Sequence, residues 1–314
     1  MSGMAVTPVE PTPEALRDPV RRYVLATRPA FLGITAVGCL LGFALAAEFH
    51  WHLAVFTLTL ALLAHAGINV LNDYYDHLNG TDAANTGRLF PFTGGSRFIQ
   101  NRVLSPRQTL AYGLGLFAVV IAGGLWLMVH AGTGLFWIGL AGLAIGWSYS
   151  APPLRLNSRG LGEACVTAGF LLIVAGGSYV QQGRIDPRVW IVGLPYALLV
   201  TNVLYINQFP DREADRLAGK WHWVVRLRPQ VAARGYWLIL CLAAVTLVTA
   251  VQAGALPLWA LASLPGLLPG LLAARLLSVR AAEPWRLRPA IRMSILAAHL
   301  QPVLLAAVLF WGRA

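Results

Sequence analysis

Nine long apolar stretches alternate with short polar ones along nearly the whole chain. A bilayer core about 30 Å thick needs about 20 apolar residues for each crossing helix, and backbone groups in lipid must be paired within the segment. The pattern therefore predicts an all-α polytopic membrane bundle of nine transmembrane helices. We place these spans at residues 24–47, 51–75, 107–129, 133–150, 161–181, 188–209, 234–253, 257–277 and 290–311.

The composition supports a single membrane domain. Of the 314 residues, 57% are hydrophobic and only 12% are charged, whereas a soluble domain carries about 25% charged residues. We expect one transmembrane domain over residues 21–314. Residues 1–20 hold four prolines and mixed charges, which is typical of a disordered tail. The three cysteines stand singly inside apolar stretches, as small hydrophobic residues do.

The basic residues indicate the orientation. The net charge is +11, and 21 of the 24 Lys and Arg residues fall on one side of the predicted spans. Cytoplasmic loops carry an excess of such residues, so we expect a multi-pass inner-membrane protein with a cytoplasmic N-terminus and an external C-terminus. Since the basic residues flank spans, we expect the lipid bilayer as a partner and no nucleic acid. The three exceptions are Arg184, Arg188 and Arg313.

Two short segments hold six of the thirteen acidic residues. Residues 69–82 close the second predicted span, and residues 207–220 close the sixth. In each segment an Asn is followed by acidic residues at helical spacing, so these side chains share one helix face. An even number of crossings separates the two segments, and both faces should therefore open on the same side. The shared faces carry Asn69, Asp73 and Asp76, and Asn207, Asp211 and Asp215.

Clustered carboxylates need a compensating cation. Two carboxylates 4 Å apart repel by about 4 kcal/mol at an effective dielectric constant of about 20. A donor set made of oxygen alone suits Mg²⁺ better than zinc, and Mg²⁺ usually combines one or two carboxylates with substrate phosphates. Two acidic walls beside Arg and Lys residues therefore indicate a clamp for a diphosphate.

Other interpretations of the acidic segments are weaker. Ordinary solvated loop charges have no reason to repeat the same Asp spacing after an Asn twice on one membrane face. A proton or cation relay in a transporter would place carboxylates along the middle of the membrane, whereas these crowd the helix ends. CDP-alcohol phosphotransferases also use Asp clusters in membranes, but their pattern of Asp within one span and the next is absent here.

At these residues the chain resembles the UbiA superfamily of membrane prenyltransferases, over the first seven predicted spans most clearly. Its two motifs, NDxxD and DxxxD, are matched in order by Asn72-Asp73-Tyr-Tyr-Asp76 and Asp211-Arg-Glu-Ala-Asp215. Within the superfamily it is most similar to the branch that prenylates 1,4-dihydroxy-2-naphthoate in menaquinone biosynthesis. The segments that carry this likeness are Thr93-Gly-Gly-Ser-Arg97, Tyr149-Ser-Ala-Pro-Pro-Leu-Arg155, Arg159-Gly-Leu-Gly-Glu163 and Ala218-Gly-Lys220.

The resemblance implies a Mg²⁺-dependent transfer of a polyprenyl group from a polyprenyl diphosphate to an aromatic acceptor. The catalytic metal ligands that it implies are Asp73, Asp76, Asp211 and Asp215. The residues that it implies for orienting the diphosphate and receiving its charge are Asn69, Asn72, Asn207, Arg88, Arg97 and Lys220. Those beside the prenyl cation and an acidic acceptor are Tyr149 and Arg155 or Arg159, although both arginines are also typical topological anchors.

Two departures from the family pattern leave the acceptor open. Gln208-Phe209-Pro210 stands where the naphthoate branch commonly has Asn-x-Arg, and Trp221-His222-Trp223 replaces the frequent Arg-Thr-Leu. We expect 1,4-dihydroxy-2-naphthoate first, with 4-hydroxybenzoate, homogentisate or a non-aromatic acceptor as alternatives. A transporter with an acidic ion site is the alternative of another class. The sequence assigns no role to His65 or Glu163.

Overall fold

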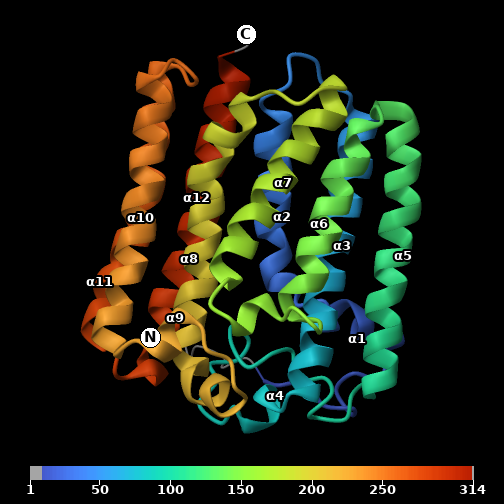
Figure 1. The fold of residues 1–314 in the computed structure, drawn as a ribbon, viewed down its shortest axis with the longest axis vertical. Helices are drawn as coiled ribbons and strands as arrows, with labels where there is room; N and C mark the ends of the chain where they lie inside the picture. Colours follow the sequence, from blue (N-terminus) through green and yellow to red (C-terminus); the bar gives the residue numbers. More distant parts are fainter. Residues whose placement is uncertain (1–8, 313–314) are drawn as a thin grey trace, which may run out of the picture.

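The computed structural model describes residues 9–312, and within this range every regular element is a helix (Figure 1). The all-α prediction is confirmed. The long helices are α3 (Trp51–Leu78), α5 (Pro106–Ala131), α6 (Gly134–Ser150), α7 (Gly162–Gln182), α8 (Arg188–Leu217), α10 (Pro229–Gln252), α11 (Leu268–Arg280) and α12 (Arg288–Trp311). The remaining elements are α1 (Pro19–Ala26), α2 (Pro29–Phe43), α4 (Thr81–Ala84), α9 (Trp223–Arg226), η1 (Leu156–Ser158), η2 (Leu258–Leu267) and η3 (Pro284–Arg286).

The number of spans agrees with the prediction only in part. In the described range, seven helical segments are long and apolar enough to cross a membrane, or eight if the bent pair α1 and α2 forms one span. Helix α6 lies at the position of the predicted span 133–150, but its 17 residues are fewer than the others have. All of these helices run along the long axis of the molecule (Figure 1). The chain is thus an integral membrane protein.

The first predicted span, 24–47, is broken instead of continuous. Asp18 caps α1 by accepting hydrogen bonds from the backbone N–H groups of Val20 and Arg21. The helix then stops before Pro29, because proline disfavours the helical conformation in the residue that precedes it. Arg28 has a positive φ of 59° there, and α1 and α2 meet at 63°. At the break, Arg28 lies outside the regular hydrogen-bonded part of both helices.

Helix α8 continues beyond its predicted end at residue 209. Pro210 lies inside the helix, which runs on to Leu217. A proline inside a helix is tolerated in membrane proteins where neighbouring groups satisfy the freed backbone. As a result Asn207, Asp211 and Asp215 share one continuous helix, as their spacing requires. The eighth span also differs from a regular helix, since it begins as the 3₁₀ segment η2 around Pro265.

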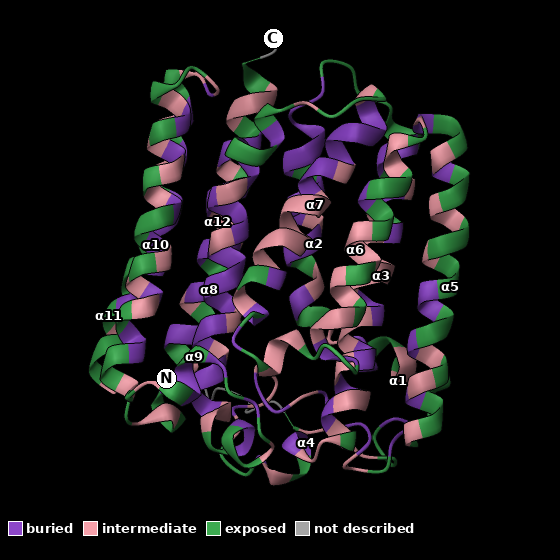
Figure 2. Cartoon of the chain, viewed as in Figure 1, coloured by how far each residue is buried: buried purple, intermediate pink, exposed green. Residues whose placement is uncertain are grey.

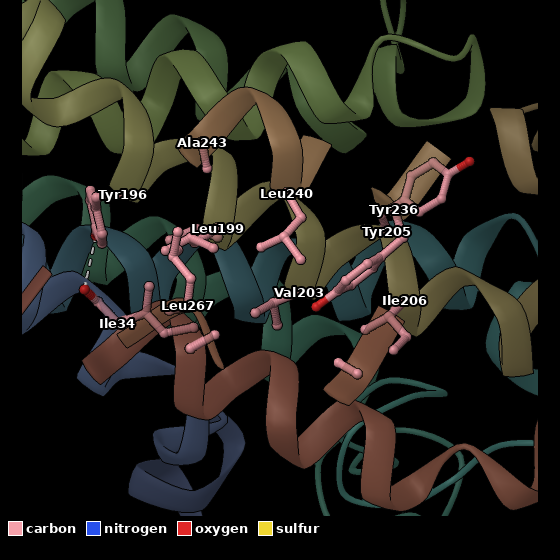
Figure 3. Packing of buried hydrophobic residues seen from close by; sticks show 14 of the residues in the cluster. Ile34, Tyr196, Leu199, Val203, Tyr205, Ile206, Tyr236, Leu240, Ala243 and Leu267 are labelled. Carbon is pink, nitrogen blue, oxygen red and sulfur yellow. Dashed lines mark hydrogen bonds between the residues drawn. The ribbon is translucent and has the colours of Figure 1, made fainter. Parts of the chain in front are cut away.

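Helix α8 is the centre of the bundle. In its most apolar stretch 72% of the residues are buried, against 22% in α5 at the edge, and the exposed faces of α5 and α10 are visible in Figure 2. Tyrosine hydroxyls in this core bond to backbone carbonyls, because an unpaired polar group in lipid is costly. Tyr196 donates to Ile34 O at 2.9 Å (Figure 3). Tyr205 donates to Ala232 O, also at 2.9 Å.

Helices α2 and α7 approach each other through glycines. A Cβ atom at Gly42 would lie 2.4 Å from the carbonyl oxygen of Val174 and 3.0 Å from Ser178 N. Both obstacles are backbone atoms, which cannot move aside as a flexible side chain can. Small residues permit close backbone approach between membrane helices. This contact fixes α7 beside α2, and α7 in turn lines part of the cavity described below.

We predict that Gly42→Ala lowers the thermal unfolding temperature of the purified protein. The added methyl group forces the two backbones apart, and overpacking typically costs about 1–3 kcal/mol. Gly115→Ala in α5 is the matched control, since a Cβ atom there meets nothing within 4 Å. Thermal unfolding in detergent measures both variants. An unchanged unfolding temperature for Gly42→Ala would contradict the close contact.

Candidate active site

The two acidic helix ends meet at one end of the bundle, which we call the acidic end. It carries the last turns of α3 and α8, together with α4 and α9 (Figure 1). The Lys220 ammonium joins the two helices: its Nζ lies 2.6 Å from Asp76 Oδ1 and 3.5 Å from Asp215 Oδ1. The three side chains are buried. The structure therefore brings the two motifs together on one side of the bundle, as the even number of crossings between them indicated.

The loop that follows α3 supplies backbone donors to both walls. Ser96 N–H points at both carboxylate oxygens of Asp73, at 3.2 and 3.3 Å. On the other wall Asp211 accepts from Asn85 Nδ2 at 2.5 Å and from Gly94 N–H at 3.4 Å. The segment Thr93–Arg97 thus spans the gap between α3 and α8 and fixes one carboxylate on each side.

The second glycine of this segment is required by the carboxylates. Gly95 has φ 71°, a conformation that favours glycine. A Cβ atom there would stand 2.6 Å from Asp82 Oδ2 and 3.0 Å from Asp73 Oδ1. Asp82 and Asp73 therefore approach the same backbone position from two sides, and any side chain at residue 95 would push them apart.

Asp82 extends the acidic set, although the sequence assigned it no role. It is almost completely buried and accepts a hydrogen bond from Gln100 Nε2 at 3.3 Å. Burial, followed by the nearby carboxylates of Asp76 and Asp73, raises the pKa of Asp82 well above its usual range. Its place six residues after Asp76, the last residue of the NDxxD motif, was the available signal. A side chain in this position favours either a proton or a cation.

Lys220, which follows α8, balances part of this charge, and His222 lies beside it. Burial alone would lower the pKa of Lys220, but the carboxylates of Asp76 and Asp215 outweigh it and raise that pKa above its ordinary value. His222 Nε2 lies 3.0 Å from Asp215 Oδ2. The family departure at Trp221-His222-Trp223 therefore places a histidine directly on a wall carboxylate. Lys220 keeps its charge at any physiological pH.

A cavity of about 650 Å³ opens between the two walls and continues into the apolar bundle. Its polar end is lined by acidic residues from both walls and by Lys220. Its apolar part lies between α3, α5, α6 and α7, where Gly139 and Gly142 leave open space. Among the predicted residues, those that line it are Asn69, Asn72, Asp76, Tyr149, Asn207, Asp211, Asp215 and Lys220.

The asparagines of the motifs hold the walls in place. Asn69 Nδ2 donates to Thr27 O at 3.0 Å, which ties α3 to the break after α1. Asn72 Nδ2 donates to Ser150 Oγ at 2.8 Å and ties α3 to α6. Asn207 Oδ1 is buried and has no hydrogen-bond partner among the described residues.

Four predicted arginines lie elsewhere. Arg88 pairs with Glu10 at 2.7 Å, and Arg97 lies 3.9 Å from the same carboxylate. None of the four belongs to the cavity lining among the described residues. Arg155 and Arg159 are exposed. Arg97 Nη1 nevertheless donates a hydrogen bond to the backbone carbonyl of Asp82, so this side chain lies beside the acidic set although it is outside the cavity lining.

The pair with Glu10 also bears on the tail predicted over residues 1–20. Residues 1–8 lie outside the described residues. Beyond them, Leu16 is buried, and Glu10 accepts a hydrogen bond from Asn101 Nδ2 at 3.2 Å. This part of the chain therefore packs on the loop that carries the backbone donors.

Arg28 lines the cavity instead. Sequence reasoning counted it only as a topological charge. The break between α1 and α2 turns its guanidinium over the ring of Phe31, 5.0 Å from the centroid, and leaves its Nε without a hydrogen-bond partner among the described residues. The signal was an arginine immediately before a proline inside an apolar run. A free guanidinium N–H beside acidic walls suits a phosphate oxygen.

The carboxylates fit a divalent metal that is shared with a ligand. Within residues 9–312, no group of three or more acidic, His or Cys side chains converges to hold a metal ion by itself. Yet Asp73 and Asp82 approach the same point beside Gly95, and the cavity is lined by Asp76 and Asp82 from one side of the site and by Asp211 and Asp215 from α8, while Asp73 lies outside its lining. Oxygen donors supplied in ones and twos from opposite walls suit Mg²⁺ whose remaining ligands are phosphate oxygens and water.

A family model described as the UbiA prenyltransferase family matches residues 32–296. The chain belongs to the UbiA prenyltransferase family. It is therefore a prenyltransferase, and the resemblance that the two motifs carry is confirmed. The matched range contains both acidic walls, Lys220 and the described lining of the cavity apart from Arg28 and Phe31.

Proteins of similar sequence have related names. The chain is 30% identical over 307 residues to a Mycobacterium tuberculosis protein named 1,4-dihydroxy-2-naphthoate octaprenyltransferase. The aligned region covers 93% of this chain and 98% of that protein. A Mycobacterium leprae protein of the same name is 27% identical, over 66% of this chain and 69% of that one. A Synechocystis protein named 2-carboxy-1,4-naphthoquinone phytyltransferase is 29% identical, over 76% and 72%.

Solved structures of the family share the fold. A UbiA homologue from Archaeoglobus fulgidus, solved bound to DMAPP and Mg²⁺, superposes with a TM-score of 0.61 at 16% identity, over 90% of this chain and 99% of that one. An apo UbiA homologue from Aeropyrum pernix gives 0.62 at 18% identity, over 95% and 100%. The helical bundle is thus the UbiA fold.

We predict that Mg²⁺ stabilises this prenyltransferase more at about pH 7.5 than at about pH 5.5, because the ion must displace the proton that Asp82 holds. A carboxyl whose pKa is raised by folding stabilises the folded state at low pH, and that contribution is lost as the pH rises through the raised pKa. Thermal unfolding with and without MgCl₂ measures the difference. In Asp82→Asn the gain should depend less on pH, and an equal gain at both pH values in the unsubstituted protein would refute the prediction.

Proposed function

We propose that this protein transfers a polyprenyl group from a polyprenyl diphosphate to 1,4-dihydroxy-2-naphthoate, with Mg²⁺ bound between its two acidic walls. The observation that carries the proposal is the pair of carboxylate walls, bridged by Lys220, at the mouth of an apolar cavity. The anionic head of a prenyl diphosphate matches the polar end of this cavity, and its apolar tail matches the apolar part. The names of the mycobacterial relatives support the acceptor.

The walls would bind the diphosphate through metal. The A. fulgidus homologue was solved with DMAPP and Mg²⁺, and the oxygen donors described above suit the same ion. Asp73, Asp76, Asp211 and Asp215 would hold it, with Asp82 as a further donor. When bound, the ion neutralises the diphosphate and makes it a better leaving group. The ligands stay in place because backbone N–H groups and Lys220 already orient them.

Charged side chains would receive the charge of the departing diphosphate. As the C–O bond breaks, negative charge grows on the diphosphate oxygens, and preorganised cations stabilise it. Lys220 and Arg28 line the cavity and can reach this charge, and Arg28 takes the part that the sequence assigned to Arg88 and Arg97. The ring of Tyr149 also lines the cavity, where its face would stabilise the allylic cation.

The apolar part of the cavity would hold the prenyl chain. The cavity extends from the two acidic motifs into the opposite half of the bundle, where Leu60 and Met128 are part of its lining. The glycines of α6 leave room for the chain between the helices. The diphosphate leaves with the electron pair of the broken C–O bond. The acceptor ring then attacks the allylic carbon, a C–C bond forms, and the attacked ring carbon loses its proton, or its carboxyl group as CO₂, so that the ring becomes aromatic again.

A reconstituted reaction tests the proposal. Purified protein with Mg²⁺, a polyprenyl diphosphate and 1,4-dihydroxy-2-naphthoate should release pyrophosphate and form a prenylated naphthalene, and both products can be measured. Asp73→Asn and Asp211→Asn should each lower turnover more than about a hundredfold, the usual scale for removing one preorganised electrostatic group. Glu213→Gln is the control, because Glu213 is exposed and pairs with Arg216 outside the cavity. Full activity in either Asp variant would refute the two-wall arrangement.

We also predict that Arg28→Met raises the KM for the prenyl diphosphate about tenfold or more, which is the effect of losing one charge-assisted hydrogen bond. Arg88→Met should have a smaller effect, since Arg88 pairs with Glu10 away from the cavity. Steady-state kinetics with varied prenyl diphosphate distinguishes the two. A larger effect at Arg88 than at Arg28 would reverse the assignment.

A further inference from the structure

Unpaired hydrogen-bond acceptors gather on α7 and α8 beside the acidic walls. Asn207 Oδ1, Gln208 Oε1 and Glu163 Oε2 are all buried, and none has a hydrogen-bond partner among the described residues. Asn207 and Gln208 line the cavity. Leaving a buried polar group without a partner is costly, because the group has lost its hydrogen bonds to water. Three such oxygens near one another indicate a place for a ligand that donates hydrogen bonds.

The Gln208 side chain is held in one orientation. Its Nε2 donates to Glu163 Oε1 at 3.0 Å. A glutamine amide has two orientations of nearly equal shape, one with the oxygen and one with the nitrogen at a given point. Glu163 accepts only from the nitrogen, so the carbonyl oxygen of Gln208 stays free as an acceptor. Glu163 stands in the first turn of α7, where the helix favours a negatively charged side chain.

The position of this pair suits the acceptor substrate. Gln208 is 8% exposed and lies on α8 between Val203 and Asp211, all of which line the cavity. The ring of Tyr149 also lines the cavity, and its edge would lie 3.6 Å from a Cβ atom at residue 162, next to Glu163. An aromatic ring bound at this position would have the carbonyl oxygen of Gln208 on one side, as a hydrogen-bond acceptor. On its other side would be the acidic walls that hold the diphosphate.

We propose that Gln208 recognises a hydroxyl group of the aromatic acceptor through its carbonyl oxygen, and that Glu163 is the positioning residue that fixes the amide. The inference rests on the proposed function, in that it concerns the acceptor of the same site. It defines the substrate class as rings with a free hydroxyl that donates a hydrogen bond. The Gln208-Phe209-Pro210 departure from the family pattern then has a role in selecting the acceptor.

The test compares a hydroxylated acceptor with its methyl ether, which keeps the ring but cannot donate. The unsubstituted protein should prefer the free hydroxyl by about tenfold in kcat/KM, the size of one net hydrogen bond. Gln208→Met keeps the length of the side chain and removes the amide, so the preference should disappear. Glu163→Gln frees the amide to turn over, and the preference should fall to an intermediate value.

Controls separate this effect from damage to the protein. The KM for the prenyl diphosphate should stay the same in both variants, and Glu213→Gln should keep the full preference. If Gln208→Met fails to fold, Glu163→Gln and the comparison of the two acceptors by the unsubstituted protein still decide the matter. Equal rates with hydroxyl and methyl ether in the unsubstituted protein would overturn the inference.

The outcome also distinguishes this inference from the proposed acceptor. If 1,4-dihydroxy-2-naphthoate is not prenylated but another hydroxylated ring is, only the proposed acceptor fails, and the same comparison is made with that ring and its methyl ether. If 1,4-dihydroxy-2-naphthoate is prenylated and its methyl ethers react equally well, the acceptor stands and the role of Gln208 is refuted.

Discussion

The contact of one ammonium group with two carboxylates determines the geometry of the acidic end. Lys220 joins Asp76 on α3 to Asp215 on α8, two residues that are 139 positions apart in the chain. A buried ion pair adds little net stability, because desolvation offsets most of the attraction. Losing the ammonium would nevertheless leave two buried carboxylates facing each other. The pair therefore fixes the distance between the walls more than it stabilises the fold.

The membrane-like core makes that distance rigid. Helix α8 is buried along most of its length, and its tyrosines bond to α2 and α10. A helix in this position cannot slide without breaking backbone contacts that lipid cannot replace. The walls are therefore held at one depth, while the loop after α3 supplies N–H donors to both. Binding of a cation and a diphosphate then needs little rearrangement.

The sequence predicted those features that depend on local periodicity. The apolar pattern located the spans, i, i+3 spacing placed Asp73 with Asp76, and i, i+4 spacing placed Asp211 with Asp215. The loops were a different matter, because their path depends on tertiary contacts. Nothing local indicates that Glu10 holds Arg88, and although Pro29 signals a break at Arg28, it does not indicate that the arginine turns toward the cavity. The same holds for the orientation of Gln208, which depends on a helix 45 residues away in the chain.

The breaks in the helices are also informative. Proline predicts interruption, yet Pro29 ends a helix while Pro210 lies within one. The difference is burial and context, since Pro210 lies in the most enclosed helix of the bundle. The consequence is functional: the first break brings Arg28 to the cavity, and the unbroken α8 keeps Asp211 and Asp215 on one wall.

The position of the metal tests the central claim most directly. Crystals of the protein with Mn²⁺ in place of Mg²⁺ and an unreactive prenyl diphosphate analogue would give an anomalous signal from each metal ion. The two-wall arrangement predicts metal between Asp73 or Asp76 on α3 and Asp211 or Asp215 on α8, with diphosphate oxygens completing its ligands. Metal bound to one wall alone, or a diphosphate bound outside the cavity, would contradict it.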